Sequence, residues 1–214
     1  MNLVIVALDA ESLWRCTGIA AHCAHVKIEG VITDGWNSSV SGPAWITHDQ
    51  LMTRNDRNAF HVLVTGGAVE LNQKRLTRFM EYKSAGLRIG NLVGVNSSLA
   101  DGVRIRENSL LASNVLVDPG ADLGANIVIG ANTTVGAGAR LGHSAWIGAG
   151  CSIGSGARIG KNCVLGDGVR VASNVVLEPW SALCADYHLE STPGMPLFVD
   201  PLFRAPVFLH GIPS

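Results

Sequence analysis

An aliphatic residue occupies every sixth position of this 214-residue chain from Val93 to Leu183, without a break. The positions are Val93, Leu99, Ile105, Leu111, Val117, Leu123, Ile129, Val135, Leu141, Ile147, Ile153, Ile159, Leu165, Val171, Leu177 and Leu183. Helices repeat about every 3.6 residues and strands every 2, so neither accounts for this period. Hexapeptide repeats are instead typical of a solenoid of short parallel strands. The sequence therefore predicts a β-solenoid over this region.

Two further positions of each hexad support the prediction. The residue two before most of the aliphatic ones is small or β-branched, which suits a second inward position in a narrow interior. The residue three after them is Asn or Gly at thirteen of fifteen places. These residue types tolerate left-handed backbone angles, so we expect a corner at the end of each hexad. Only Ser144 and Trp180 depart from the rule.

The motif [LIV]-G-x-x-[small]-x recurs at Ile129-Gly130, Ile153-Gly154 and Ile159-Gly160. It resembles that of the hexapeptide-repeat acyltransferase superfamily. The resemblance implies a left-handed parallel β-helix in which three hexads form one triangular coil and residues eighteen apart stack on one face. About five coils, spaced by roughly 4.8 Å, would form a prism on the order of 24 Å tall.

Residues 1–86 have a different pattern, in which short apolar runs alternate with helical ones. Such alternation indicates a small parallel sheet with helices. It resembles the Rossmann-like N-terminal domain of sialic-acid- and bacillosamine-type sugar acetyltransferases, which binds the acceptor nucleotide sugar. A Gly42-Pro43 turn interrupts the pattern, and Gly86 ends it. We expect strands at Leu3–Ala7, Val26–Thr33 and His61–Thr65, and helices at Glu11–Ala24, Asp49–Met52 and Glu70–Ser84.

The expected fold is therefore mainly β, with three parts. Residues 1–86 form the small α/β domain, residues 87–185 the left-handed β-helix, and residues 186–214 a proline-rich tail. The repeat is expected to stop at Ala185-Asp186-Tyr187-His188. The tail is too apolar to be stable in water by itself, so we expect it to pack over the open end of the prism or against another subunit.

The turn after the first expected strand departs from the family pattern. The related enzymes have glycines there, whereas this chain has Leu8-Asp9-Ala10-Glu11. Two carboxylates would repel a diphosphate, which argues against a nucleotide-sugar acceptor. Gly66 and Gly67, after a later strand, are a second candidate for substrate binding. The alternative is that they form a plain loop.

Composition excludes several classes of partner. The formal net charge is -1, and no basic cluster suggests nucleic acid or an anionic membrane surface. The chain has no long apolar run and no signal-peptide pattern at its start, so a cytoplasmic location is expected. Five cysteines are an odd number, and Cys151 and Cys163 fall on inward positions of the coil. Neither disulfides nor a metal site is expected.

His143 is the single histidine of residues 87–185 and the candidate catalytic base. The resemblance implies that acyl-CoA binds in a groove between subunits of a homotrimer, where a histidine deprotonates the acceptor as it attacks the thioester. The family has an acidic residue after this histidine, and Ser144 takes its place here. An alignment on the later glycines instead puts the family pair over Ala137-Gly138, which would leave no base. A solvated surface histidine is the further alternative.

Candidates for binding the acyl-CoA surround His143. Lys161, eighteen residues later, should lie one coil along, where it would contact a CoA phosphate or keep the imidazole uncharged. The alternative is a solvated surface lysine. Gly160 belongs to the coil backbone that would hold the pantetheine. Trp146 would pack on the CoA or fill a trimer contact, and His188 in the tail is a second candidate for the chemistry.

The sequence thus predicts an acyltransferase, specifically an acetyltransferase, that moves an acyl group from acetyl-CoA to an amine or hydroxyl of a sugar or nucleotide-sugar acceptor. The alternative is a non-catalytic trimeric assembly or binding protein that keeps the β-helix without the base. The carbonic-anhydrase branch of this fold needs three histidines on zinc, which a single coil histidine does not supply.

Overall fold

The computed structural model describes residues 1–33, 44–68, 72–203 and 205–208. Its N-terminal part is a parallel sheet in the order β3-β2-β1-β4, which confirms the three strands expected there. Gly42-Pro43 and the expected helix start at Glu70 lie outside the described residues. The strands of this sheet are β1 (Asn2–Ala7), β2 (Lys27–Thr33), β3 (Ala44–Trp45) and β4 (His61–Thr65).

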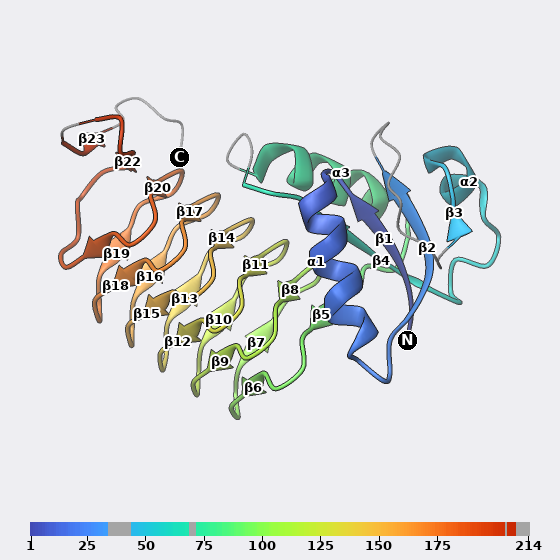
Figure 1. The fold of residues 1–214 in the computed structure, drawn as a ribbon, viewed down its shortest axis with the longest axis horizontal. Helices are drawn as coiled ribbons and strands as arrows, with labels where there is room; N and C mark the ends of the chain where they lie inside the picture. Colours follow the sequence, from blue (N-terminus) through green and yellow to red (C-terminus); the bar gives the residue numbers. More distant parts are fainter. Residues whose placement is uncertain (34–43, 69–71, 204, 209–214) are drawn as a thin grey trace.

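The three helices are α1 (Ala10–Ala21), α2 (His48–Thr53) and α3 (Gln73–Ser84). Helix α1 begins after Asp9, whose carboxylate accepts a hydrogen bond from the Ser12 amide, as expected of an N-cap. Successive residues of β1 alternate between two cores: Ile5 packs with α1, and Val6 packs with α3. Helices therefore lie on both sides of the sheet, and we call this part the α/β unit (Figure 1).

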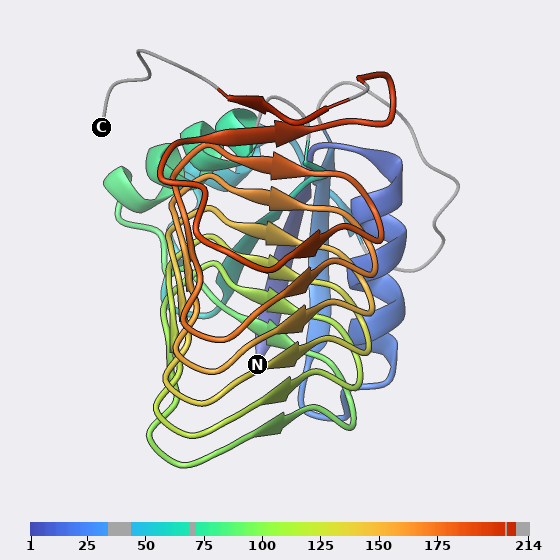
Figure 2. The ribbon, with the colours of Figure 1, turned by 90° about the vertical axis from the view of Figure 1, so that its left-hand side faces the viewer.

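The remaining strands stack into three parallel sheets that wind around one axis (Figure 2). The first, named the groove sheet, consists of β7 (Arg104–Ile105), β10 (Asp122–Leu123), β13 (Arg140–Leu141), β16 (Arg158–Ile159) and β19 (Val176–Leu177).

The second, named the packed sheet, contains β5 (Leu92–Val93), β8 (Leu110–Leu111), β11 (Val128–Ile129), β14 (Trp146–Ile147), β17 (Val164–Leu165) and β20 (Ala182–Leu183). The third sheet contains β6 (Ser98–Leu99), β9 (Leu116–Val117), β12 (Thr134–Val135), β15 (Ser152–Ile153), β18 (Arg170–Val171) and β21 (His188–Leu189). Together with the family matches below, this arrangement is consistent with a left-handed β-helix.

Pairing follows the predicted spacing of eighteen: Leu123 lies opposite Leu141, and Leu141 opposite Ile159. These aliphatic residues and the small ones two positions earlier form one buried core along the axis. Every predicted corner has a positive φ angle, including Ser144 at 61° and Trp180 at 66°. Ser144 and Trp180 thus differ from the other corners in residue type but not in backbone conformation.

The coil continues beyond the expected end at residue 185. Asp186 adopts the same left-handed corner, with φ 56°, and β21 pairs with β18. Leu189, six residues after Leu183, is buried like its predecessors. Aspartate tolerates this conformation nearly as asparagine does, so the change of residue type at Asp186 did not end the repeat.

The tail then covers the far end of the coil. Strand β22 (Leu197–Val199) pairs in parallel with β20, and β23 (Val207–Phe208) returns antiparallel to it. Leu197 is buried and joins the coil core. The α/β unit lies beside the first coils and β22 and β23 lie at the opposite end (Figure 1). None of the described helices is both long and apolar enough to cross a membrane.

The α/β unit is attached to the packed sheet. Leu92, Leu110 and Val128 point outward from that sheet into the core that contains α1. Beside them, Asn108 exchanges two hydrogen bonds with the backbone of Val64 in β4, of 2.8 and 3.0 Å. The groove sheet contributes no strand to this junction, so its outer surface remains open.

Candidate active site

The groove sheet carries an open hollow of about 220 Å³ along its outer surface, which we call the groove. Each strand places one side chain outward, immediately before its buried aliphatic residue, and the turn that follows β13 adds His143. The groove therefore combines an imidazole, a charged row and bare backbone. Its lining includes Arg106, Asp122, Arg140, His143, Arg158 and Gly160.

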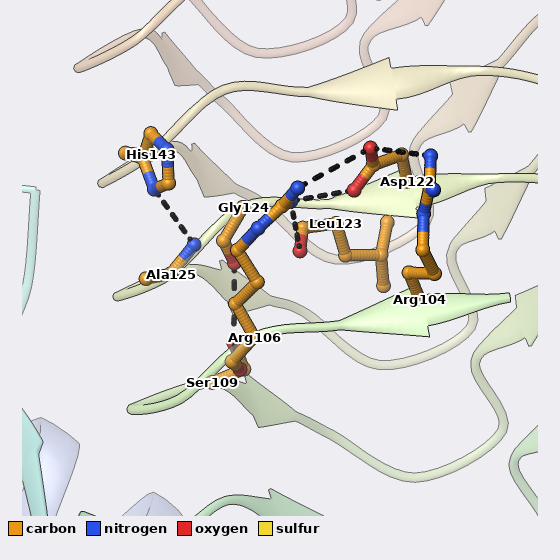
Figure 3. A network of polar contacts seen from close by, with 8 residues as sticks. All are labelled: Arg104, Arg106, Ser109, Asp122, Leu123, Gly124, Ala125 and His143. Atoms are coloured by element: carbon orange, nitrogen blue, oxygen red, sulfur yellow. Dashed lines mark hydrogen bonds and ion pairs between the residues drawn. The ribbon is translucent and has the colours of Figure 1, made fainter.

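His143 lies in the turn between β13 and β14 and is exposed. The backbone amide of Ala125, one coil earlier, donates a hydrogen bond of 3.0 Å to Nδ1 (Figure 3). A ring nitrogen that accepts a hydrogen bond carries no proton, so the neutral ring in this orientation is protonated on Nε2. To accept a proton, the ring must either change tautomer, which frees Nε2, or turn over, which frees Nδ1, and in both cases it releases the Ala125 amide. That release costs about one hydrogen bond, on the order of 1 kcal/mol.

Asp122 is held by two arginines beside His143. Arg106 Nη1 donates to one carboxylate oxygen at 2.5 Å, and Arg104 Nη2 to the other at 3.0 Å (Figure 3). The hydrogen bond from Arg106, together with the charges of both guanidiniums, keeps the pKa of Asp122 below its ordinary value. Asp122 therefore remains an anion at neutral pH, and its oxygens bind arginines.

Gly160 and Lys161 lie one coil beyond His143. The amide of Asn162 donates to the His143 carbonyl at 2.9 Å, which confirms the stacking. Gly160 lines the groove, but a Cβ at this position would lie 2.4 Å from the Pro179 nitrogen. Coil packing alone therefore requires this glycine. Lys161 is exposed at the rim of the turn and does not line the groove.

Trp146 does not lie in the groove, so its expected position is corrected. It projects from the packed sheet onto α1 of its own chain, because the outward positions of this sheet form the junction with the α/β unit. The guanidinium of Arg15 lies 5.9 Å from the centre of its ring. Trp146 and Arg15 line a separate hollow of about 260 Å³ between α1 and the coil.

Gly66 and Gly67 lie at the carboxyl end of β4, beside the turn that follows β1. They line a hollow of about 90 Å³ with Asp9, Lys74 and Arg75. The amide of Gly67 donates to Asp9 Oδ2 at 2.6 Å, and the other oxygen of this carboxylate caps α1. Asp9 thus takes up the backbone donors that a glycine-rich turn would offer to a phosphate.

Arg75 of α3 supports the turn that carries His143. It is almost fully buried, and its Nη2 donates to the carbonyl of Asn126 at 2.9 Å and, more weakly, to that of Ser144 at 3.4 Å. Burial lowers the pKa of Arg75 to about 9, while the charge of Asp9 acts in the opposite direction. The Ser144 hydroxyl accepts a hydrogen bond of 2.9 Å from Asn126, so this serine belongs to the buried support of the turn.

The charged row of the groove was missed at the sequence level, although the sequence contains its signal. Outward residues of the groove sheet stand immediately before every third aliphatic position, as Arg104, Asp122, Arg140 and Arg158. The equivalent positions of the packed sheet are Leu92, Leu110, Val128 and Trp146. Sorting the outward residues by a spacing of eighteen would have distinguished the charged face from the covered one.

Within the described ranges, no group of three or more His, Cys, Asp or Glu residues is arranged to hold a metal ion. Two family models match the coil. The model "Bacterial transferase hexapeptide (six repeats)" matches residues 109–143 and 144–179, and "Hexapeptide repeat of succinyl-transferase" matches residues 87–119. No curated protein matches the chain.

Two solved structures share the fold over nearly the whole chain. The acetyltransferase domain of PglB from Neisseria gonorrhoeae is 18% identical, with a TM-score of 0.79 over 97% of this chain and 99% of that one. A His-to-Ala mutant of GDP-perosamine N-acetyltransferase from Caulobacter crescentus, in complex with CoA and GDP-perosamine, is 17% identical, with a TM-score of 0.80 over 94% and 95%. The PglB domain is also known in complex with acetyl coenzyme A. The resemblance inferred from the six-residue period is thereby confirmed: residues 87–179 match hexapeptide-repeat models, and residues 109–179 of them match the bacterial transferase hexapeptide.

Proposed function

We propose that this protein is a CoA-dependent acyltransferase, specifically an acetyltransferase, that acts on an amine or hydroxyl of a sugar or nucleotide-sugar acceptor. The observation that carries the proposal is the exposed imidazole of His143 in an open groove of a hexapeptide-repeat coil. Support comes from the shared fold with two acetyltransferases, one of them in complex with CoA and a nucleotide sugar.

In this proposal His143 is the general base. Its unprotonated nitrogen takes the proton of the acceptor amine or hydroxyl as the acceptor lone pair attacks the thioester carbonyl. The tetrahedral intermediate collapses with cleavage of the carbon–sulfur bond, CoA leaves as the thiolate, and the proton on the imidazole neutralises it. Before this, the ring releases the Ala125 amide, at a cost that is small because His143 is exposed.

The groove suits an acyl-CoA substrate. Gly142 and Gly160 present bare backbone beside His143, where an extended pantetheine arm can approach closely. Lys161 at the rim supplies a cation for a phosphate group. Trp146 faces α1, and we assign it no contact with CoA.

In this proposal the α/β unit serves as a Rossmann-like acceptor domain, with Gly66 and Gly67 near the ligand. Asp9 occupies the local backbone donors, which argues against a diphosphate bound at this turn. The coils are proposed to assemble as a homotrimer in the cytoplasm, with the groove between neighbouring copies.

A non-catalytic assembly protein is the second candidate. One observation favours it: the Ala125 amide engages Nδ1 of His143. Ser144, where the resemblance implies an acidic residue, agrees with it.

Thermal denaturation with acetyl-CoA, together with thiol release in the presence of a panel of amino sugars, separates the two candidates. An enzyme is stabilised by acetyl-CoA, because a ligand that binds only the folded form raises its apparent stability. We expect His143→Ala to keep this stabilisation and to lose roughly 10²- to 10⁴-fold in transfer rate. His188→Ala removes the other exposed coil histidine, the second candidate for the chemistry, and should transfer at the wild-type rate if His143 is the base. A loss of transfer in His188→Ala alone would reassign the base to His188. An absence of any acetyl-CoA effect at millimolar concentration would favour the assembly protein.

A further inference from the structure

Four of the five strands of the groove sheet, β7, β10, β13 and β16, each place one charged side chain in a column, and the fifth, β19, has Val176 there. Arg104, Asp122, Arg140 and Arg158 are outward residues of consecutive strands, and the register places each directly beside the next. Adjacent strands lie about 4.8 Å apart, so neighbouring side chains of the column are within contact reach. The column runs along the groove that also contains His143.

The two ends of the column differ in how their charge is balanced. Arg104 forms an ion pair with Asp122, and Arg106 adds a second one. The guanidiniums of Arg140 and Arg158, in contrast, form no ion pair or hydrogen bond with any residue that the structure describes, although both side chains are exposed in the groove. Glu178 lines the same groove, and its carboxylate forms no ion pair with either of them.

Two unpaired guanidiniums opposite each other on neighbouring strands repel, and like charges in this position destabilise a sheet. If the pair had no role, a carboxylate at either position would make the sheet more stable, as Asp122 does between the arginines of the first coils. The planar guanidinium binds the oxygens of carboxylates and phosphates in a bidentate way, and two of them can enclose one such group.

The position of the pair constrains the source of the anion. Arg140 precedes His143 by three residues, so their backbones lie within about 10 Å, and Arg158 lies one coil further. In acyl-CoA the pantetheine arm separates the phosphates from the thioester. An anion bound this close to the base is therefore better supplied by the acceptor than by the phosphates of CoA.

We infer that Arg140 and Arg158 form a binding site for a carboxylate or phosphoryl group in the His143 groove, and that the acceptor of the proposed reaction is acidic. The identity of the ligand as acceptor depends on the proposed function. The anion site itself does not depend on it.

Inorganic phosphate is the probe, at constant ionic strength, with the Nε–H signals of ¹⁵N-labelled arginines as the readout. We expect saturable shifts at Arg140 and Arg158. The variants Arg140→Gln and Arg158→Gln should each lower the affinity for phosphate by about tenfold, because each removes a charged hydrogen-bond donor. Arg170→Gln is the matched control, since Arg170 has the same outward position on the third sheet, and it should leave the affinity unchanged. Shifts that do not saturate, or that are equal at Arg170, would overturn the inference.

Repeating the titration with saturating CoA identifies the source. Phosphate that still binds beside CoA assigns the site to the acceptor, whereas competition assigns it to the CoA phosphates. A change of oligomeric mass in the double variant, without phosphate binding to the wild type, would assign the pair to a contact between copies and overturn the inference. Because the phosphate titration needs no acyl transfer, its failure is distinguishable from an inactive His143.

Discussion

Single residues at one column of corners form hydrogen bonds to the α/β unit and to one another. Ser144 and Trp180 belong to the same corner column, which faces the α/β unit through the contacts of Asn108 with Val64 and of Arg75 with Asn126. Its asparagines form a ladder: Asn108 donates to Asn126 at 2.7 Å, and Asn126 donates to Ser144 at 2.9 Å. The ladder then stops, and the buried Oδ1 of Asn162 has no hydrogen-bond partner in the part of the chain that the structure describes.

Ser144→Asn should extend the ladder and stabilise the protein. An asparagine amide at this position can donate to Asn162 Oδ1, and asparagine tolerates the left-handed conformation better than serine does. We expect a gain of about 1 kcal/mol in the free energy of unfolding, measured by urea denaturation. The control Ser144→Ala removes the acceptor of the Asn126 amide and should cost about 1 kcal/mol. A stability below that of the wild type for Ser144→Asn would show that the corner is too closely packed for the longer side chain.

At the scale of single elements, contacts between neighbouring coils limit which residues fit after each strand. Where a glycine follows the aliphatic residue, it approaches the next coil closely: a Cβ at Gly160 would lie 2.4 Å from the Pro179 nitrogen and 2.6 Å from its Cα. In α1, by contrast, a Cβ at Gly18 would meet nothing within 4 Å. Sequence identifies both residues as glycines, but only the coil requires one.

Gly160→Ala and Gly18→Ala should therefore have opposite effects. Overpacking against backbone atoms is expected to cost about 1–3 kcal/mol or more for Gly160→Ala. Gly18→Ala should stabilise by about 0.5–1 kcal/mol, because alanine loses less backbone entropy in a helix. Equilibrium unfolding of both variants provides the measurement, and a neutral Gly160→Ala would indicate that the coils can separate to accept the methyl group.

At the scale of the whole molecule, the coil and the α/β unit share a boundary. The interior of the coil forms one core, and a second core combines α1 and β1 with the outward residues of the packed sheet. Cys163 belongs to the first core and Cys16 to the second. Desolvation on burial raises the pKa of both thiols to about 12, and that of Cys151 to about 11.

These thiols predict a loss of stability at alkaline pH. A thiol whose pKa is higher in the folded than in the unfolded state, here above the reference value of 9.0, stabilises fully below pH 9 and progressively less as pH rises toward 11 or 12. The urea concentration at the midpoint of unfolding should therefore decrease as pH rises above 9, and Cys163→Ala should make this decrease shallower.

Thiol labelling tests whether the molecule unfolds as one body. The half-buried Cys184 should react in the native protein, whereas Cys16 and Cys163 should react together in the unfolding transition. Labelling of Cys16 at a lower urea concentration than Cys163 would instead show that the α/β unit opens separately.

The sequence by itself determined the coil, its corners and its core, because these depend on local periodicity: every sixth side chain points inward wherever the strand–corner unit repeats. It also located His143 and the alternation of strands and helices before residue 86. Only the tertiary structure decided which face of the coil is covered, that Trp146 packs on α1, that Ala125 donates to His143 and that Arg140 and Arg158 remain unpaired. These features depend on residues from eighteen positions apart, as for Ala125 and His143, to 131 positions apart, as for Arg15 and Trp146. The six-residue period contains no information about which of them meet.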